Sequence, residues 1–206
     1  MLTTKQLKIF GLFGKNTFKE HTFKELKASS KEKSHSVLQN AISRFLKEEL
    51  IAERKVGTSK LYKINHNNDK VHDYLRLNNQ DQLSKAVKTS IRYVKESLDK
   101  EESFYALVIF GSYADQTFTK KSDLDLAVFI SDKKNKIEIA LHSASNKTII
   151  DIDYHIITEL EFQEMLKADY ENLGKQIARK NLPIYNPSIF YKLIIKGIEN
   201  GYNPLS

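Results

Sequence analysis

Residues 104–110, FYALVIF, form an unbroken apolar run without a single charge. Successive side chains of a strand point to opposite faces of its sheet, so this run offers apolar side chains to both faces. Such a strand is stable only where both faces of the sheet are covered. The run therefore predicts a buried strand. With 40% hydrophobic and 29% charged residues, the chain has the composition of a globular protein and not of a disordered one.

Two further strands with acidic residues follow this run. Asp123 and Asp125 open the apolar stretch LAVFI, and residues 148–157, TIIDIDYHII, contain Asp151 and Asp153. Residues two apart on a strand share a face, so Asp123 and Asp125 are expected to project together. Asp151 and Asp153 share a face of their own strand for the same reason.

Carboxylates held this close repel one another unless a cation lies between them, and oxygen ligands select Mg²⁺, with Mn²⁺ as an alternative. A third carboxylate from a neighbouring strand would complete a site for two metal ions about 3.5–4 Å apart. Such a pair of ions can coordinate a triphosphate, activate an attacking oxygen and stabilise the leaving pyrophosphate. Gly111 and Ser112, directly after the first strand, would offer backbone N–H groups and a hydroxyl to phosphate oxygens.

The segment GSYADQTFTKKSDLDLAVF, with the later aspartate strand, resembles the polymerase-β-type nucleotidyltransferase superfamily, and most closely its minimal members. The resemblance covers about residues 81–190 and implies an α/β domain with a small mixed sheet flanked by helices. It implies that Asp123, Asp125 and Asp153 are catalytic and bind the metal ions. Asp151 has the same parity as Asp153 and is a further candidate ligand.

The resemblance also implies an NTP as substrate, with ATP as the first candidate. The residues expected to contact it are Gly111, Ser112, Lys121 and Ser122. Asp115-Gln116 stands where minimal members commonly have Arg-Gly. His155 shares the parity of the aspartates on its strand, so it is expected to face the same side.

The N-terminal third has a different pattern. Apolar spacing and capping residues predict helices over residues 4–14, 22–29 and 34–46, and strands over 51–56 and 60–64 around a turn at Gly57. This order, and the stretch SHSVLQNAISRFLKEELIAERKVGTSKLYKIN, resembles winged helix-turn-helix domains. The resemblance implies that the third helix enters the DNA major groove and that a hairpin wing contacts the backbone. The candidate DNA-contacting residues are His35, Ser36, Gln39, Asn40, Lys55 and Lys60.

Charge favours the same interpretation. Residues 1–65 hold 14 Lys and Arg against 6 Asp and Glu, a net +8, whereas the remaining residues sum to −1. A clustered positive charge attracts the phosphate backbone without reading sequence. A lysine-rich solvated surface, or a module for protein contacts or dimerisation, would have the same composition. The charge alone leaves these alternatives open.

The domain boundary is expected in the polar, Asn-rich residues 67–79, which separate a domain at 1–66 from one at 80–206. The apolar stripe Leu83, Val87, Ile91, Val94, Leu98 predicts a connector helix over residues 80–99. If this stripe serves a partner chain instead, the protein forms a homodimer. The overall fold class is therefore α+β.

The predicted function is Mg²⁺-dependent transfer of a nucleoside monophosphate, for example AMP, from an NTP to a hydroxyl, coupled to binding of duplex DNA. The acceptor stays open; minimal members include antitoxins that adenylylate a HEPN-type toxin, so a protein acceptor is one candidate. The alternative is a non-catalytic DNA-binding regulator with a degenerate nucleotide-binding domain. No apolar run approaches 18 residues and the N-terminal residues lack a signal-peptide layout, so we expect no membrane association and a cytoplasmic location.

Overall fold

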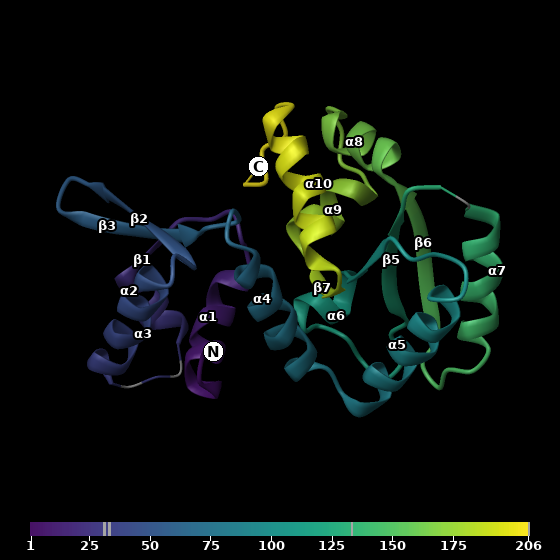
Figure 1. Cartoon of the computed structure of the whole chain (residues 1–206), viewed down its shortest axis with the longest axis horizontal. Helices are drawn as coiled ribbons and strands as arrows, with labels where there is room; N and C mark the ends of the chain where they lie inside the picture. Colours follow the sequence, from purple (N-terminus) through teal and green to yellow (C-terminus); the bar gives the residue numbers. More distant parts are fainter. Residues whose placement is uncertain (31, 33, 133, 206) are drawn as a thin grey trace. The chain divides into compact units, whose positions relative to one another are not determined.

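The computed structural model describes residues 1–30, 32, 34–132 and 134–205. Within these residues the chain forms ten helices and seven strands (Figure 1). The strands form a three-stranded and a four-stranded sheet. The chain divides into two compact units, an N-terminal unit of residues 1–78 and a C-terminal unit of residues 79–204. No helix in the described part of the chain is long and apolar enough to cross a membrane.

The N-terminal unit contains three complete helices, residues 69–78 of a fourth, and an antiparallel sheet in the order β1-β3-β2. Its elements are α1 (Thr4–Gly14), β1 (His21–Thr22), α2 (Phe23–Ser29), α3 (His35–Lys47), β2 (Ile51–Val56) and β3 (Ser59–Ile64). The three helices and the hairpin predicted from the sequence are confirmed. The two-residue strand β1 was not predicted, because so short a pairing leaves no periodic pattern.

Local capping fixes where these helices begin. Thr22 and Glu25 form a capping box at the start of α2, in which each side chain bonds the other residue's backbone N–H. The buried ring of Phe10 on α1 packs edge-on against Phe45 on α3, with ring centroids 5.3 Å apart. Aromatic packing of this kind holds the helices of the unit together.

The sequence-based view of the segment between the units was wrong in two respects. Residues 67–79 are mostly helical, because Val71 and Leu75 recur four apart and are fully buried in α4 (Asp69–Gln82). The predicted helix over residues 80–99 begins only at Lys85: Ser84 caps α5 (Lys85–Leu98), while residues 80–82 belong to α4. The division between the two units, after residue 78, lies within residues 67–79, where the boundary was expected, but inside the helix α4.

The C-terminal unit is built on a mixed sheet in the order β6-β5-β4-β7. β5 and β6 are parallel, and β4 is antiparallel to both β5 and β7. Besides α5, its elements are β4 (Tyr105–Ile109), α6 (Gly111–Asp115), β5 (Leu124–Ile130), α7 (Lys134–Ser145), β6 (Ile152–Thr158), α8 (Glu159–Lys167), α9 (Leu173–Arg179), β7 (Leu182–Tyr185) and α10 (Pro187–Glu199). The strand predicted from residue 148 starts later, because the Thr148 hydroxyl bonds the carbonyls of Ser145 and Ile150 in a turn.

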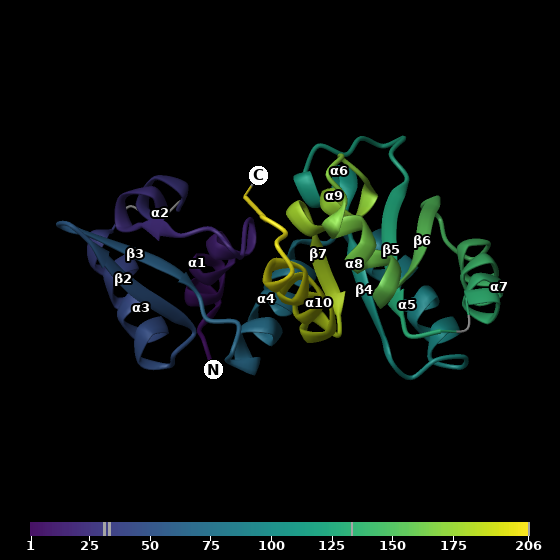
Figure 2. The same ribbon diagram turned by 90° about the horizontal axis from the view of Figure 1, so that it is seen from above.

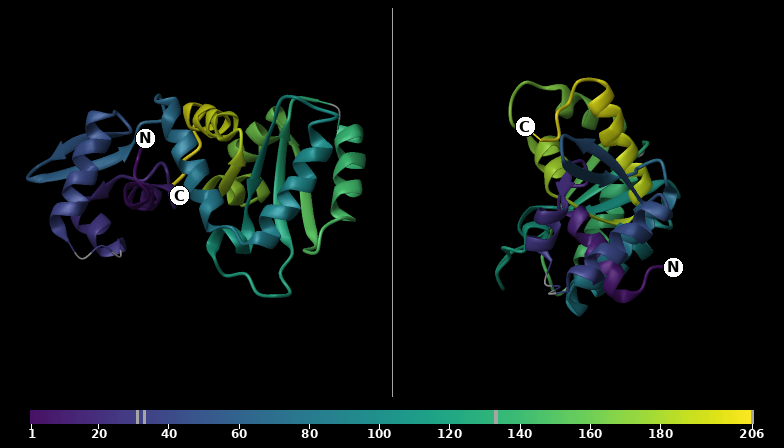
Figure 3. Two further views of the ribbon diagram at one scale, coloured as in Figure 1. Left: turned by 60° about the horizontal axis from the view of Figure 1, so that its bottom comes forward. Right: turned by 90° about the vertical axis from the view of Figure 1, so that its left-hand side faces the viewer.

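Helices cover both faces of this sheet, as the apolar run of β4 requires (Figures 2 and 3). On one face, Leu126 of β5 packs in a core cluster with residues of α5 and α7. On the other face, Phe129 of β5 contacts Phe162 of α8 and Phe190 of α10, at centroid distances of 4.9 and 5.2 Å. Alternate residues of a strand point to opposite faces, so Asp125 lies on the same face as Phe129.

Candidate active site

Asp125 and Asp153 face each other across two neighbouring strands. They are register partners in the parallel pair β5 and β6. The pKa of the Asp125 carboxyl is raised, first by burial and then by the negative charge of Asp153, while a hydrogen bond from the Ser112 N–H acts in the opposite direction. The structure thus brings together two carboxylates whose repulsion a cation would relieve.

Gly111 allows this arrangement. It lies at the start of α6 with a φ of +60°, in the left-handed region. A Cβ atom at this position would lie 2.0 Å from Oδ2 of Asp125, closer than any real contact. The absence of a side chain lets the Asp125 carboxylate reach the backbone N–H of Ser112. The predicted residues Gly111, Ser112 and Asp125 are therefore adjacent in space.

Asp123 and Asp151 form a second, more exposed part of the site. Both precede their strands, and the N–H of Leu124 donates to the carbonyl of Asp151 at 2.8 Å. Both aspartates line a cavity of about 570 Å³, together with the predicted nucleotide contacts Lys121 and Ser122. Gly111 and Ser112 do not line this cavity. The predicted residues thus fall into two neighbouring groups.

The carboxylates do not form a closed metal-ligand cluster. In residues 1–30, 32, 34–132 and 134–205, no three His, Asp or Glu side chains are close enough to hold a metal ion together. The donor set nevertheless fits a hard cation, because its ligand atoms are carboxylate oxygens on neighbouring strands. Asp123 and Asp153 are exposed and repel Asp125, so their side chains are free to turn towards a cation and have reason to spread without one.

Two side-chain contacts near the candidate site were not predicted from the sequence. Nε2 of His155 lies 3.6 Å from Oδ2 of Asp153, so this ring does face the side of the aspartates. Lys180, which follows α9, forms an ion pair with Asp115 at 2.7 Å. This pair balances the charge of Asp115 at the end of α6. Because 65 residues separate Asp115 from Lys180, no local sequence pattern could have revealed the pair.

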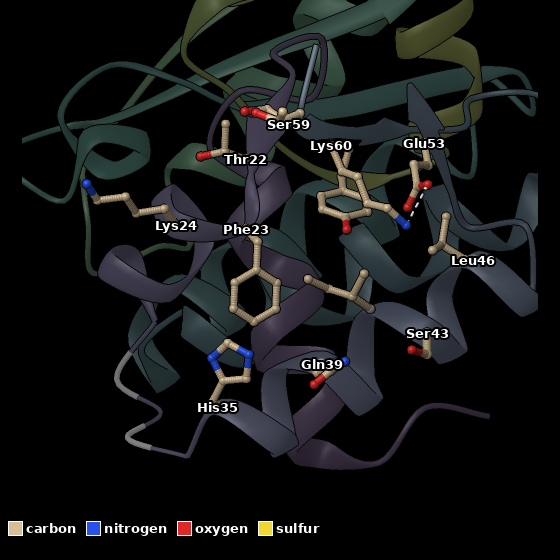
Figure 4. A pocket seen from close by; sticks show the side chains of 13 residues that line it. Thr22, Phe23, Lys24, His35, Gln39, Ser43, Leu46, Glu53, Ser59 and Lys60 are labelled. Atoms are coloured by element: carbon tan, nitrogen blue, oxygen red, sulfur yellow. Dashed lines mark ion pairs between the residues drawn. The ribbon is translucent and has the colours of Figure 1, made fainter. Parts of the chain in front are cut away.

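The candidate DNA-contacting residues of α3 point in more than one direction. His35 and Gln39 line a cavity of about 520 Å³ between α2, α3 and the hairpin β2–β3, and Figure 4 shows His35 beside Phe23. The two rings lie 4.7 Å apart. Ser36 and Asn40 are exposed and do not line this cavity.

The two hairpin lysines differ in their environment. Lys55 and Lys60 are opposite each other in the register of β2 and β3, and both are exposed. Lys60 forms an ion pair with Glu53 at 2.9 Å (Figure 4), and this contact raises the pKa of the Lys60 ammonium. Lys55 forms no ion pair with any residue that the structure describes. Lys55 is thus the cation of this pair that is available to another molecule.

Comparison with known proteins adds one finding. No curated protein matches the chain. The family model for polymerase beta, nucleotidyltransferase matches residues 92–189. This range includes β4, α6, β5 and β6, and with them the candidate ligands Asp123, Asp125, Asp151 and Asp153. Residues 92–189 are therefore a polymerase beta nucleotidyltransferase domain.

Proposed function

We propose that the C-terminal unit transfers a nucleoside monophosphate from an NTP, with ATP as the first candidate, to a hydroxyl group. The observation that carries the proposal is the register pairing of Asp125 with Asp153 beside the Ser112 N–H, inside the matched domain. The acceptor oxygen bonds to the α-phosphorus, the bond to the bridging oxygen breaks, and pyrophosphate leaves with the electron pair. The Asp153 carboxylate accepts the hydroxyl proton, and His155 is the next group able to receive it.

Mg²⁺, or Mn²⁺, is proposed as the cofactor, with Asp123, Asp125 and Asp153 as ligands and Asp151 as a further candidate. Bound there, the ion would neutralise triphosphate charge and activate the attacking hydroxyl. Gly111 and Ser112 are proposed to approach the phosphates with backbone N–H groups, and Lys121 and Ser122 to contact the nucleotide from the loop before β5.

The test is transfer of label from each of the four α-labelled NTPs, with Mg²⁺, with Mn²⁺ and with a chelator. We expect metal-dependent release of pyrophosphate by the full chain and none by Asp125→Asn or Asp153→Asn. Asp169→Asn is the matched control, because Asp169 is exposed and lies outside the site. NTP binding without turnover in the wild-type protein, under every metal condition, would instead favour the alternative of a nucleotide-sensing regulator.

We also propose that the N-terminal unit is a winged helix-turn-helix domain that binds duplex DNA. The order of three helices and a hairpin, the exposed polar residues of α3 and the net charge of +8 over residues 1–65 support this proposal. Binding of the full chain to labelled duplex should weaken steeply with salt, by about 0.9 in the log–log slope for each neutralised phosphate. Because Lys60 is paired with Glu53, Lys55→Ala should weaken binding more than Lys60→Ala. Equal losses, or binding that salt does not affect, would contradict this assignment.

The acceptor follows from the resemblance only as a candidate. A HEPN-type toxin would make the protein an antitoxin that acts by adenylylation. A neighbouring gene for a small all-helical protein would provide the acceptor to test, and labelling of that protein by the wild-type chain but not by Asp125→Asn is the expected result.

A further inference from the structure

The two outer strands of the mixed sheet, β6 and β7, differ in how their outer edges are protected (Figure 1). Along β7, the side-chain amide of Asn79 donates to the carbonyl of Pro183 at 3.1 Å. The side-chain amide of Gln80 donates to the carbonyl of Ile184 at 2.9 Å, so side chains cover this edge. β6 is seven residues long and contains neither Lys nor Pro, the residues that commonly protect an edge strand.

The hydrogen bonds of β6 indicate which of its backbone groups point to the outer edge. In a parallel pair, every second residue bonds the neighbouring strand, and the residues between them point their backbone groups away from it. The N–H of Leu124 donates to the carbonyl of Asp151, so the odd-numbered residues of this segment bond β5. The backbone N–H and C=O groups of Ile152, Tyr154 and Ile156 therefore point outward.

These outward groups form a short open stretch with two closed ends. At one end, the Thr148 hydroxyl donates to the carbonyl of Ile150 at 2.8 Å. At the other end, the N–H of Thr158 donates to the Glu161 carboxylate at 2.9 Å. Between these ends, β6 pairs with β5 alone, and its outward backbone groups form no hydrogen bond within the described part of the chain. An unprotected edge of this kind pairs readily with another strand.

We propose that β6 is the interface of a homodimer, in which the β6 strands of two copies pair antiparallel and join the two mixed sheets into one. A two-fold axis perpendicular to the sheet would pass beside Tyr154. Ile152 then lies opposite Ile156 of the partner subunit, and Tyr154 lies opposite Tyr154 of the partner subunit. Each of these pairs exchanges two backbone hydrogen bonds. A shift by two residues in either direction would leave one outward residue without its counterpart.

Charge complementarity favours a second copy of this chain over an unrelated strand. In the proposed register, Asp153 lies directly opposite His155 of the partner subunit, and His155 lies opposite the partner's Asp153. The side chains of Asp153 and His155 are 59% and 38% exposed, so both are accessible to a neighbouring strand. A shift by two residues would place Asp153 opposite the same carboxylate of the partner or opposite an isoleucine. Opposite charges on facing residues stabilise a strand pair, whereas like charges destabilise it.

Exposed apolar side chains lie near both ends of β6. Ile149, before the strand, is 93% exposed, and Leu160, after it, is 69% exposed. Antiparallel pairing brings the start of one β6 to the end of the other, so Ile149 comes to the same end of the dimer interface as Leu160 of the partner subunit. Removal of such side chains from water favours association. The apolar stripe of α5 offers no alternative interface, because Val87, Val94 and Leu98 are buried in the core cluster.

The test uses the full chain without nucleotide or DNA. Equilibrium sedimentation should give twice the mass of one chain. Because the chain has no Cys, engineered thiols can report the register without background. Residues 153 and 155 of the two copies would form a non-hydrogen-bonded pair with Cα atoms about 4.5 Å apart, a distance that a disulfide spans. Asp153→Cys and His155→Cys proteins, mixed and allowed to exchange subunits, should therefore crosslink under mild oxidation.

The control mixture combines His155→Cys with Asp169→Cys, since Asp169 is exposed and lies outside β6. We expect the Asp153→Cys mixture to crosslink at least about tenfold faster, because pairing of the strands holds its two thiols at a high effective concentration. His155→Asp should raise the dimer dissociation constant at least about tenfold, and His155→Lys should lower it. His35→Asp on α3, the same exchange at an exposed histidine of the N-terminal unit, should leave the constant as in the wild-type protein.

A wild-type chain that stays monomeric would overturn the proposal. A dimer whose Asp153→Cys mixture crosslinks no faster than the control mixture would overturn it as well, because such a dimer uses another surface. No step of this test involves NTP, so its result is independent of the proposed transfer reaction.

Discussion

Gly111→Ala should damage the candidate active site and destabilise the C-terminal unit together. Holding a residue with a Cβ atom at a φ of +60° costs about 1–2 kcal/mol. The new Cβ would also lie 2.0 Å from Oδ2 of Asp125, so that carboxylate must turn away and lose the hydrogen bond from the Ser112 N–H. A hydrogen bond to a charged group contributes about 1.5–3 kcal/mol, so the total loss should be about 2.5–5 kcal/mol.

Gly57→Ala is the matched control for this change. Gly57 has a φ of +57°, but a Cβ there would meet no atom within 4 Å, so only the backbone cost of about 1–2 kcal/mol should appear. The free energy of unfolding can be measured by urea titration, followed by circular dichroism and by tyrosine fluorescence, since the chain has 10 Tyr and no Trp. If Gly111→Ala lost no more stability than Gly57→Ala, the close approach of Asp125 to the backbone would not be what requires glycine here.

Three further changes test the electrostatics and the backbone. The pKa of the Asp125 carboxyl is raised in the folded protein, so its charge destabilises the fold as pH rises above 3.8, the ordinary pKa of an Asp side chain. Asp125→Asn should therefore raise the free energy of unfolding at pH 7. Urea titrations should show that this increase in stability vanishes near pH 3. Burial, together with the nearby His72 and Lys63, lowers the pKa of His66 from 6.5 to about 4. The free energy of unfolding of the N-terminal unit should therefore fall by up to about 3 kcal/mol as pH falls from 6.5 to 4. His66→Gln should reduce that loss relative to the wild-type protein. Gln116 has a φ of +60°, so Gln116→Gly should raise thermal stability, by about 0.5–1 kcal/mol once the greater entropy of the unfolded glycine is subtracted.

Much of the fold could be predicted from the sequence where a pattern is local. The apolar run before Gly111 predicted β4, and the apolar stretch LAVFI that Asp123 and Asp125 open predicted β5. The helix α4 was missed because only a few apolar residues, such as Val71 and Leu75, mark its buried side among polar neighbours. The buried neighbours Asn78 and Asn79 resemble loop residues in the sequence, because nothing local shows that they are packed inside.

The candidate active site, too, could be predicted only where the pattern is local. Parity predicted that Asp153 and His155 share a face, since it depends only on the two-residue period of a strand. The register that makes Asp153 the partner of Asp125, while the carbonyl of Asp151 accepts from Leu124, depends on how two distant strands align. The ion pair of Lys180 with Asp115 likewise depends on the tertiary fold. A local sequence pattern therefore predicts neither the strand register nor this ion pair.

Features that oppose stability gather at one end of the mixed sheet. Gly111 and Gln116 adopt left-handed backbone, Asp125 carries a charge that burial and Asp153 disfavour, and Ile149 is left exposed in the cavity that Asp123 lines. Strain and unrelieved repulsion of this kind are typical of functional sites, because a chain under selection for stability alone loses them readily. A domain kept only as a scaffold would gain stability from so small a change as Asp125→Asn. The charged pair is therefore a feature that the proposed transfer reaction would use and that stability alone does not require.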